Sequence, residues 1–204
     1  MELMDYEKAG ALLKKYGIRS IESKYVKSVQ EAISFSGGKP IVLKVISGKA
    51  LHKSKNKLVA LNLSSPKEIE SNYKELSANA KKFKPYKVLA QKMVKNGLEI
   101  IIGCNTDAQF GKMILIGLGG IYVETFKDFS LRLCPITKKD AQSMLEQLKS
   151  KSIIAPNEET SKRIEELLLK VSRMFENSKA TELDLNPVII HDNTYDAVDL
   201  RIIK

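Results

Sequence analysis

The feature that most constrains the fold is an alternating segment near the end of the chain, residues 181–188, with the sequence TELDLNPV. Alternation of this kind predicts a β-strand with polar side chains on one face and leucines on the other. A second apolar run, residues 196–200, follows after a polar stretch in which Asp192 and Asn193 can supply a turn. The sequence therefore predicts two antiparallel strands joined near residues 191–194.

Oxygen-bearing side chains on one face of these strands suit a hard cation. The period of two places Asp184 and Asn186 on the same face, and Asp199 on the returning strand is expected to face Asn186. Carboxylate and amide oxygens suit Mg²⁺, with phosphate oxygens and waters completing the octahedron. An ordinary hairpin with a polar outer face has the same pattern, so the spacing alone leaves both interpretations open.

Composition indicates a globular protein with a sizeable core. A chain of 204 residues is one large domain or two small lobes that share a site, and 43% apolar with 28% charged residues is typical of soluble proteins. Cys104 and Cys134 form no metal-binding pattern, which favours reduced thiols in an intracellular protein. The longest apolar run, residues 113–123, is too short to span a bilayer, and no signal peptide opens the chain. We therefore expect a cytoplasmic protein that is not bound to a membrane.

The net charge of +10 has three possible explanations: nucleic-acid binding, phosphorylated ligands, or a solvated surface without a charged partner. Lysines are scattered singly or in pairs, arginines are scarce, and basic residues do not alternate with aromatic ones. These features disfavour nucleic-acid binding. Phosphorylated ligands, or simply a solvated lysine-rich surface, remain as explanations of the charge.

Periodicity predicts an α+β protein in two lobes. Asn96-Gly97 predicts a hairpin between the strands at 87–94 and 98–104. A small α/β lobe is expected at about 18–84, and a larger lobe at about 86–204 packs with the N-terminal helix, with a hinge near 83–86. The expected helices are 5–15, 26–36, 66–83 with Ser65 as N-cap, 137–148 with Thr137 as N-cap and Asp140 three residues on, and 158–175; the other expected strands are 18–25, 40–46, 58–63, 112–118 and 129–133.

Lys44 stands inside the apolar strand 40–46 and must find an anion or reach solvent. It is either a phosphate-binding lysine or an edge-strand lysine whose ammonium reaches water. The loop at 47–57 contains His52, Lys53 and Ser54 among further lysines, and it suits a phosphate-covering loop. His52 can carry a phosphoryl group as a neutral imidazole, or it can be an ordinary loop residue.

Two further segments have features of a nucleotide site. Backbone groups around Gln91, Met93 and Val94 could meet an adenine edge, and Glu99 could bind ribose hydroxyls. The glycine turn at 117–120 matches neither common nucleotide-binding fingerprint, but with Arg132 nearby it could serve phosphate binding. An ordinary hairpin is the alternative for the first segment, and a tight turn with an Arg–Asp surface pair explains the second segment about as well.

Taken in order, these segments resemble the ATP-grasp domain of ADP-forming acyl-CoA synthetases. The resemblance extends from residue 7 to residue 203, and its motifs are specific in combination rather than singly. The segments that carry it are VLKV at 42–45, LHKS at 51–54, QKMV at 91–94 with Gly97 and Glu99, IG at 102–103, Asp107, QFG at 109–111, GLGG at 117–120, VE at 123–124, Asp128 through Arg132 and Pro135, ELDLNPV at 182–188 and AVD at 197–199.

The resemblance implies an ATP-grasp fold whose antiparallel and mixed sheets cradle ATP, and a beta subunit that exchanges phosphate between a phosphohistidine and ADP or ATP with Mg²⁺. It implies a hetero-oligomer with an alpha subunit that binds CoA and carries the primary phosphohistidine. In this family, Asn186 and Asp199 correspond to metal ligands and Lys44 to the nucleotide lysine. Gln91, Val94 and Glu99 fall near the adenosine contacts, and His52 falls on a proposed phosphate-shuttling histidine.

One segment departs from the family pattern. The family usually has an aspartate and two glycines soon after the shuttle histidine, whereas here residues 55–58 are Lys-Asn-Lys-Leu. Glycines allow a loop to move and to approach phosphate closely, so this loop is expected to be stiffer and more cationic. An alternative follows: a degenerate ATP-grasp module that binds nucleotide without turnover and acts as a regulatory or structural subunit.

Overall fold

The computed structural model describes residues 2–49, 57–94, 96–120 and 128–204 and divides them between two compact units. The smaller unit is Ile21–Lys95, and the larger unit combines Met1–Ser20 with Asn96–Lys204. His52, Lys53 and Ser54 lie outside the described residues. The described part of the chain contains no helix long and apolar enough to cross a membrane.

The smaller unit is a four-stranded antiparallel sheet with two helices packed against it. Alternate residues of the strands, including Ile41, Leu43 and Val45, pack with α2 and α3 in one apolar core. Ser65 is the N-cap of α3, as predicted, and it forms a capping box with Glu68. The sheet order is β1 (Ser23–Val26), β4 (Lys87–Lys92), β2 (Ile41–Ile46) and β3 (Val59–Leu63), and the helices are α2 (Val29–Ser36), α3 (Pro66–Ala80) and the 3₁₀ turn η1 (Lys81–Phe83).

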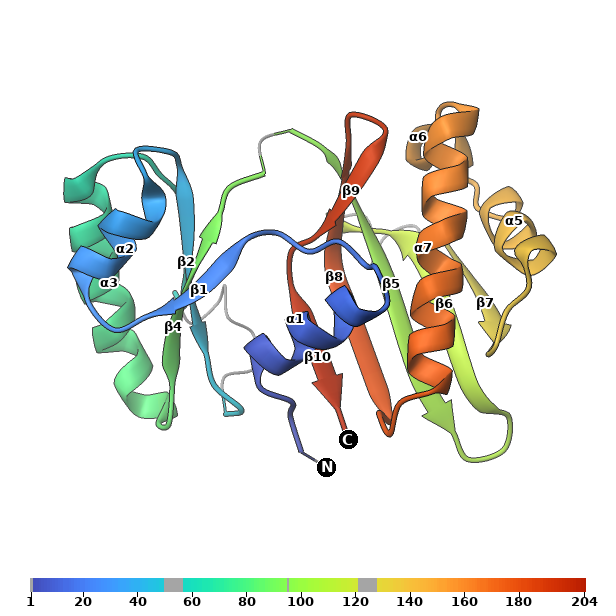
Figure 1. Cartoon of the computed structure of the whole chain (residues 1–204), viewed down its shortest axis with the longest axis horizontal. Helices are drawn as coiled ribbons and strands as arrows, with labels where there is room; N and C mark the ends of the chain where they lie inside the picture. Colours follow the sequence, from blue (N-terminus) through green and yellow to red (C-terminus); the bar gives the residue numbers. More distant parts are fainter. Residues whose placement is uncertain (1, 50–56, 95, 121–127) are drawn as a thin grey trace. The chain divides into compact units, whose positions relative to one another are not determined.

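The larger unit contains a six-stranded antiparallel sheet. Helices α1 and α7 lie on the same face of this sheet, and α5 lies beside α7 (Figure 1). The strand order is β10 (Leu200–Ile203), β8 (Glu182–His191), β5 (Leu98–Asp107), β6 (Gly111–Leu118) and β7 (Phe129–Leu133), with β9 (Thr194–Ala197) also paired to β8; the helices are α1 (Tyr6–Lys15), α5 (Lys138–Glu146), α6 (Lys151–Ile154) and α7 (Glu158–Glu176).

Several local predictions are confirmed. Asp192 and Asn193 both have positive φ and form the tight turn between β8 and β9. Thr137 and Asp140 form the capping box of α5. The apolar stripe expected on the helix at 158–175 is fully buried in α7, where its members Ile164, Leu167, Leu168, Val171 and Met174 are all 0% exposed.

The hairpin predicted at Asn96-Gly97 is wrong. β4 pairs with β1 and β2 in the smaller unit, whereas β5 pairs with β6 and β8 in the larger one. Asn96 does have the positive φ of a turn residue, but the turn leads from one unit to the other. The strand expected at 87–94 therefore belongs to the smaller unit, and the described residues on the two sides of this passage are Val94 and Asn96, not 83–86.

The two cysteines have unequal environments on the helix-covered face of the larger sheet. Both are free thiols; Cys104 is buried and Cys134 is partly exposed. Burial raises the pKa of Cys104 well above its ordinary value. A hydrogen bond from the Cys104 thiol, with a further one from Ser172, lowers the pKa of Cys134 to about 7 against the opposing effect of burial.

We predict that iodoacetamide alkylates Cys134 first and that the rate rises with pH around a midpoint near 7. The thiolate is the reactive form, so the rate follows the fraction of deprotonated Cys134. Ser172→Ala removes a stabilising donor and should move the midpoint upward. Peptide mass mapping of the modified protein makes the measurement, and faster labelling of Cys104 would contradict it.

Candidate nucleotide and metal site

Lys44 lies on an interior strand of the smaller sheet. β2 is flanked by β4 and β3, and the Lys44 side chain is only 5% exposed. The edge-strand alternative is therefore excluded. A lysine buried at this position requires electrostatic partners, because an ammonium loses much solvation energy inside a protein.

Gln91 lies on the same face as Lys44 and is fully buried. In the β2–β4 register Lys44 pairs with Leu89, and Val42 pairs with Gln91. These residues alternate with the side chains that pack against α2 and α3, so they face away from the helices. The structure thus brings together two of the predicted nucleotide-binding side chains within one unit.

Met93 and Val94 follow β4 and are half-buried. The Met93 N–H donates to the Pro40 carbonyl at 3.2 Å, which commits that amide to the smaller unit. Of the two backbone amides, that of Val94 is therefore the better candidate for an adenine edge.

The predicted metal residues lie together on the larger sheet, on the face opposite to α1 and α7. Leu183 and Leu185 are buried, whereas Asp184 is half-buried and Asn186 is exposed, as the alternation predicted. The Asn186 N–H donates to the Asp199 carbonyl at 3.2 Å, so the two residues are neighbours on adjoining segments. Asn186 and Asp199 lie on adjoining segments, and amide and carboxylate side chains are of the kind that suits a magnesium ion.

Asp184 precedes Asn186 by two positions on β8, and it lines a pocket of about 280 Å³. Arg201 pairs with Asp184 in the β8–β10 register, and Glu182 and Asn105 also line the pocket. Sequence reasoning missed Arg201, although its spacing of two from Asp199 indicated the same strand face. Among the described residues, no three His, Cys, Asp or Glu side chains gather to hold a metal ion by themselves.

The glycine turn after β6 packs closely against the backbone of Glu99. The Gly119 N–H donates to the Glu99 carbonyl at 2.7 Å, and a Cβ on Gly119 would lie 2.8 Å from the backbone of Glu99. Only glycine allows this close approach. The Glu99 carboxylate is exposed at the start of β5, where it is accessible to a hydroxyl-bearing ligand.

Arg132 lies on the helix-covered face of the larger sheet. Its guanidinium donates to Ser143 of α5 at 3.0 Å and to the Leu131 carbonyl at 2.7 Å. This face is opposite to the one that presents Asp184 and Asn186. The hydrogen bond of Arg132 to Ser143 connects β7 to α5. The expectation of a catalytic role for Arg132 has no support in this geometry.

Asp128 makes a second connection, between the start of β7 and the residues just before α6. Its carboxylate accepts from the backbone amides of Lys149 and Ser150 and from the Ser150 hydroxyl. Although burial opposes the effect, these hydrogen bonds lower the pKa of Asp128 below its ordinary value. Asp128 and Arg132 belong to a segment that carries the family resemblance, but the hydrogen bonds described for them connect β7 to the helices.

Comparison with known proteins places these residues in a family. A model of the ATP-grasp domain matches residues 2–203. The beta subunit of acetate–CoA ligase (ADP-forming) II from Pyrococcus furiosus is 40% identical, with 98% of this chain and 91% of that protein covered. The acetate–CoA ligase (ADP-forming) I of Archaeoglobus fulgidus is 37% identical over 94% of this chain, but the match covers only 30% of that protein.

Solved structures agree in fold. A crystal structure from Pyrococcus horikoshii superimposes with a TM-score of 0.90 at 41% identity, covering 98% of this chain and 91% of the other. The acetyl-CoA synthetase 1 of Ca. Korarchaeum cryptofilum, in complex with coenzyme A and Mg-AMPPCP, gives a TM-score of 0.82 at 33% identity, covering 98% and 92%. In that structure the phosphohistidine segment points towards the nucleotide-binding site. The chain therefore belongs to the ATP-grasp family, in the group that contains the beta subunits of ADP-forming acetate–CoA ligases.

Proposed function

We propose that this chain is the nucleotide-binding beta subunit of an ADP-forming acyl-CoA synthetase. The complete enzyme interconverts acyl-CoA, ADP and phosphate with the free acid, ATP and CoA. The observation that carries the proposal is the buried Lys44 on an interior strand, beside Gln91, in a chain that aligns with such beta subunits along nearly its whole length.

The nucleotide would be held by charge and by backbone groups. Lys44 neutralises phosphate oxygens, which supports an in-line transfer through electrostatics rather than covalent chemistry. The Val94 amide meets the adenine edge, and the Glu99 carboxylate accepts from ribose hydroxyls. Lys53 and Ser54 are proposed phosphate contacts on the basis of the family resemblance.

Asn186 and Asp199 would hold Mg²⁺ through side-chain oxygens. The bound ion supplies charge neutralisation at the phosphates. Asp184 was expected to be a third ligand, but its position in the pocket with Arg201 suits contact with an incoming group at least as well. We therefore propose that Asp184 acts on the same strand face as Asn186, either as a metal ligand or in contact with an incoming group.

The partner would be an alpha subunit that binds CoA and carries the primary phosphohistidine. Relatives named as beta subunits match along 91% and 89% of their length, which supports a partner of this kind. A cytoplasmic location is proposed as well, because both cysteines are free thiols, as in a reducing compartment.

The nucleotide test compares Lys44→Met with Lys24→Met. Both residues lie in the smaller sheet, but Lys24 is exposed on β1. Losing a charge-assisted contact to phosphate should weaken Mg·ADP binding about 10- to 100-fold for Lys44→Met and leave the control unchanged. Calorimetry on the assembled complex makes the measurement, with thermal melts to verify folding. Absence of nucleotide binding by the wild type would refute the function.

The turnover test asks whether His52 carries phosphate. The assembled complex is incubated with γ-labelled ATP, and acid-labile, base-stable label is sought on this chain. We expect label on the wild type, none on His52→Ala, and nearly unchanged ADP affinity in that variant. Label on the partner only, with normal turnover by His52→Ala, would make His52 an ordinary loop residue. Nucleotide binding without any label or turnover would favour the degenerate alternative.

A further inference from the structure

The chain passes between its two units twice. At both passages, the residues on the side of the larger unit contact the same hairpin. The first passage follows Ser20, which forms a parallel bridge with Ala197 of β9. The second precedes β5, whose first residue Leu98 pairs with Ile190 of β8. The β8–β9 hairpin is therefore the common attachment of both connections.

Close backbone contacts fix both attachments. The Ala197 N–H donates to the Arg19 carbonyl at 3.1 Å. At the other passage, a Cβ on Gly97 would lie 2.8 Å from the Ile190 carbonyl oxygen, so the chain passes directly against β8 there. Each connection is thus fixed to the hairpin within a residue or two of the boundary between the units.

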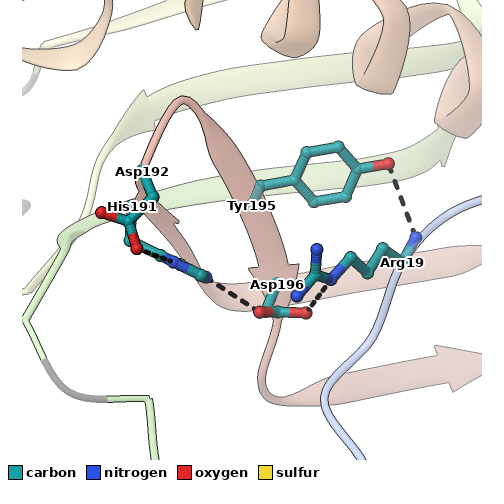
Figure 2. A network of polar contacts seen from close by, with 5 residues as sticks. All are labelled: Arg19, His191, Asp192, Tyr195 and Asp196. Carbon is teal, nitrogen blue, oxygen red and sulfur yellow. Dashed lines mark hydrogen bonds and ion pairs between the residues drawn. The ribbon is translucent and has the colours of Figure 1, made fainter.

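A buried carboxylate links side chains of the hairpin to the first passage. Asp196 is only 3% exposed, and each of its oxygens has a partner. Arg19 Nε contacts Oδ1 at 2.7 Å, and His191 Nε2 contacts Oδ2 at 2.9 Å (Figure 2). An ionised carboxylate only accepts hydrogen bonds, so this contact requires the proton of His191 on Nε2. The Tyr195 hydroxyl also accepts from the Arg19 N–H at 3.5 Å.

The far end of the hairpin is held by α7. Asn193, at the turn, donates to Glu159 at 3.1 Å and accepts from Asn157 and Thr160, each at 3.0 Å. The hairpin is therefore fixed to the helix layer at its tip and to the interunit connection at its base. A hinge needs such a fixed side, because motion is absorbed by a few residues next to rigid elements.

The same strand continues from this hairpin to the proposed metal ligands. β8 includes both His191 and Asn186, and Asn186 is hydrogen-bonded to Asp199. We propose that Asp196, with Arg19 and His191, is a hinge anchor that positions the first interunit connection relative to the metal-bearing strand. The anchor itself is independent of the reaction, whereas its effect on turnover rests on the proposed function.

Hydrogen exchange tests the anchor directly. Asp196→Asn keeps the size of the side chain but removes its charge, and we expect exchange of the amides around residues 19–20 and 197 to accelerate about tenfold. The matched control is Asp128→Asn, which also breaks several hydrogen bonds of a partly buried carboxylate in the same unit. The control should accelerate exchange near residues 128–130 and 149–151 and leave 19–20 unchanged.

Two replacements of His191 distinguish a positioning role of the Asp196 contacts from a general contribution to stability. His191→Gln retains an N–H donor for Asp196 and should exchange like the wild type, whereas His191→Phe should resemble Asp196→Asn. In the assembled enzyme, kcat should fall for Asp196→Asn and His191→Phe and recover in His191→Gln. Unchanged exchange at 19–20 in Asp196→Asn, or acceleration spread evenly over the larger unit, would overturn the anchor. A wild type that binds no nucleotide would refute the function but leave the exchange result intact.

Discussion

Strand β8 faces an apolar core on one side and presents polar ligands on the other. Leu183, Leu185 and Val188 are at most 2% exposed, while Asp184 and Asn186 face outward. The side-chain period is two, so a slip of one residue would bury the polar set and expose the leucines. Both edges of β8 are paired, with β5 on one side and β9 and β10 on the other. This register fixes the face of the sheet on which Asp184 and Asn186 lie.

The local features of the fold could be predicted because each depends on neighbours in sequence. Alternation predicted the faces of β8, and Asp192-Asn193 predicted its turn. Partners distant in sequence could not be predicted in the same way. Asn96-Gly97 has turn chemistry, but a turn signal does not say which strand follows in which sheet. Whether Lys44 occupied an edge or an interior strand likewise depended on the order of strands, which the residues of β2 alone do not determine.

β7 shows a further limit of pattern reasoning. Its apolar residues Phe129, Leu131 and Leu133 are the exposed ones, at 42–55%, while Ser130 is buried. The usual rule that apolar faces point inward therefore assigns this strand the wrong way round, whereas Arg132 was expected at the site because it follows the glycine turn at 117–120. Ser130 and Arg132 instead bond to Gln147 and Ser143 next to the helix layer. The contact between Arg19 and Asp196 joins residues 177 apart, and no sequence pattern signals it.

We propose that side-chain oxygens of Asn186 and Asp199 hold the divalent ion that accompanies the nucleotide. Replacing Mg²⁺ with Mn²⁺ allows the free ion to be counted by electron paramagnetic resonance in the presence of saturating ADP. Loss of one ligand should weaken Mn²⁺ binding about tenfold or more in both Asn186→Ala and Asp199→Ala. Lys24→Met serves as the folded control with unchanged affinity. Wild-type Mn²⁺ affinity in both ligand variants would contradict the assignment of the metal site.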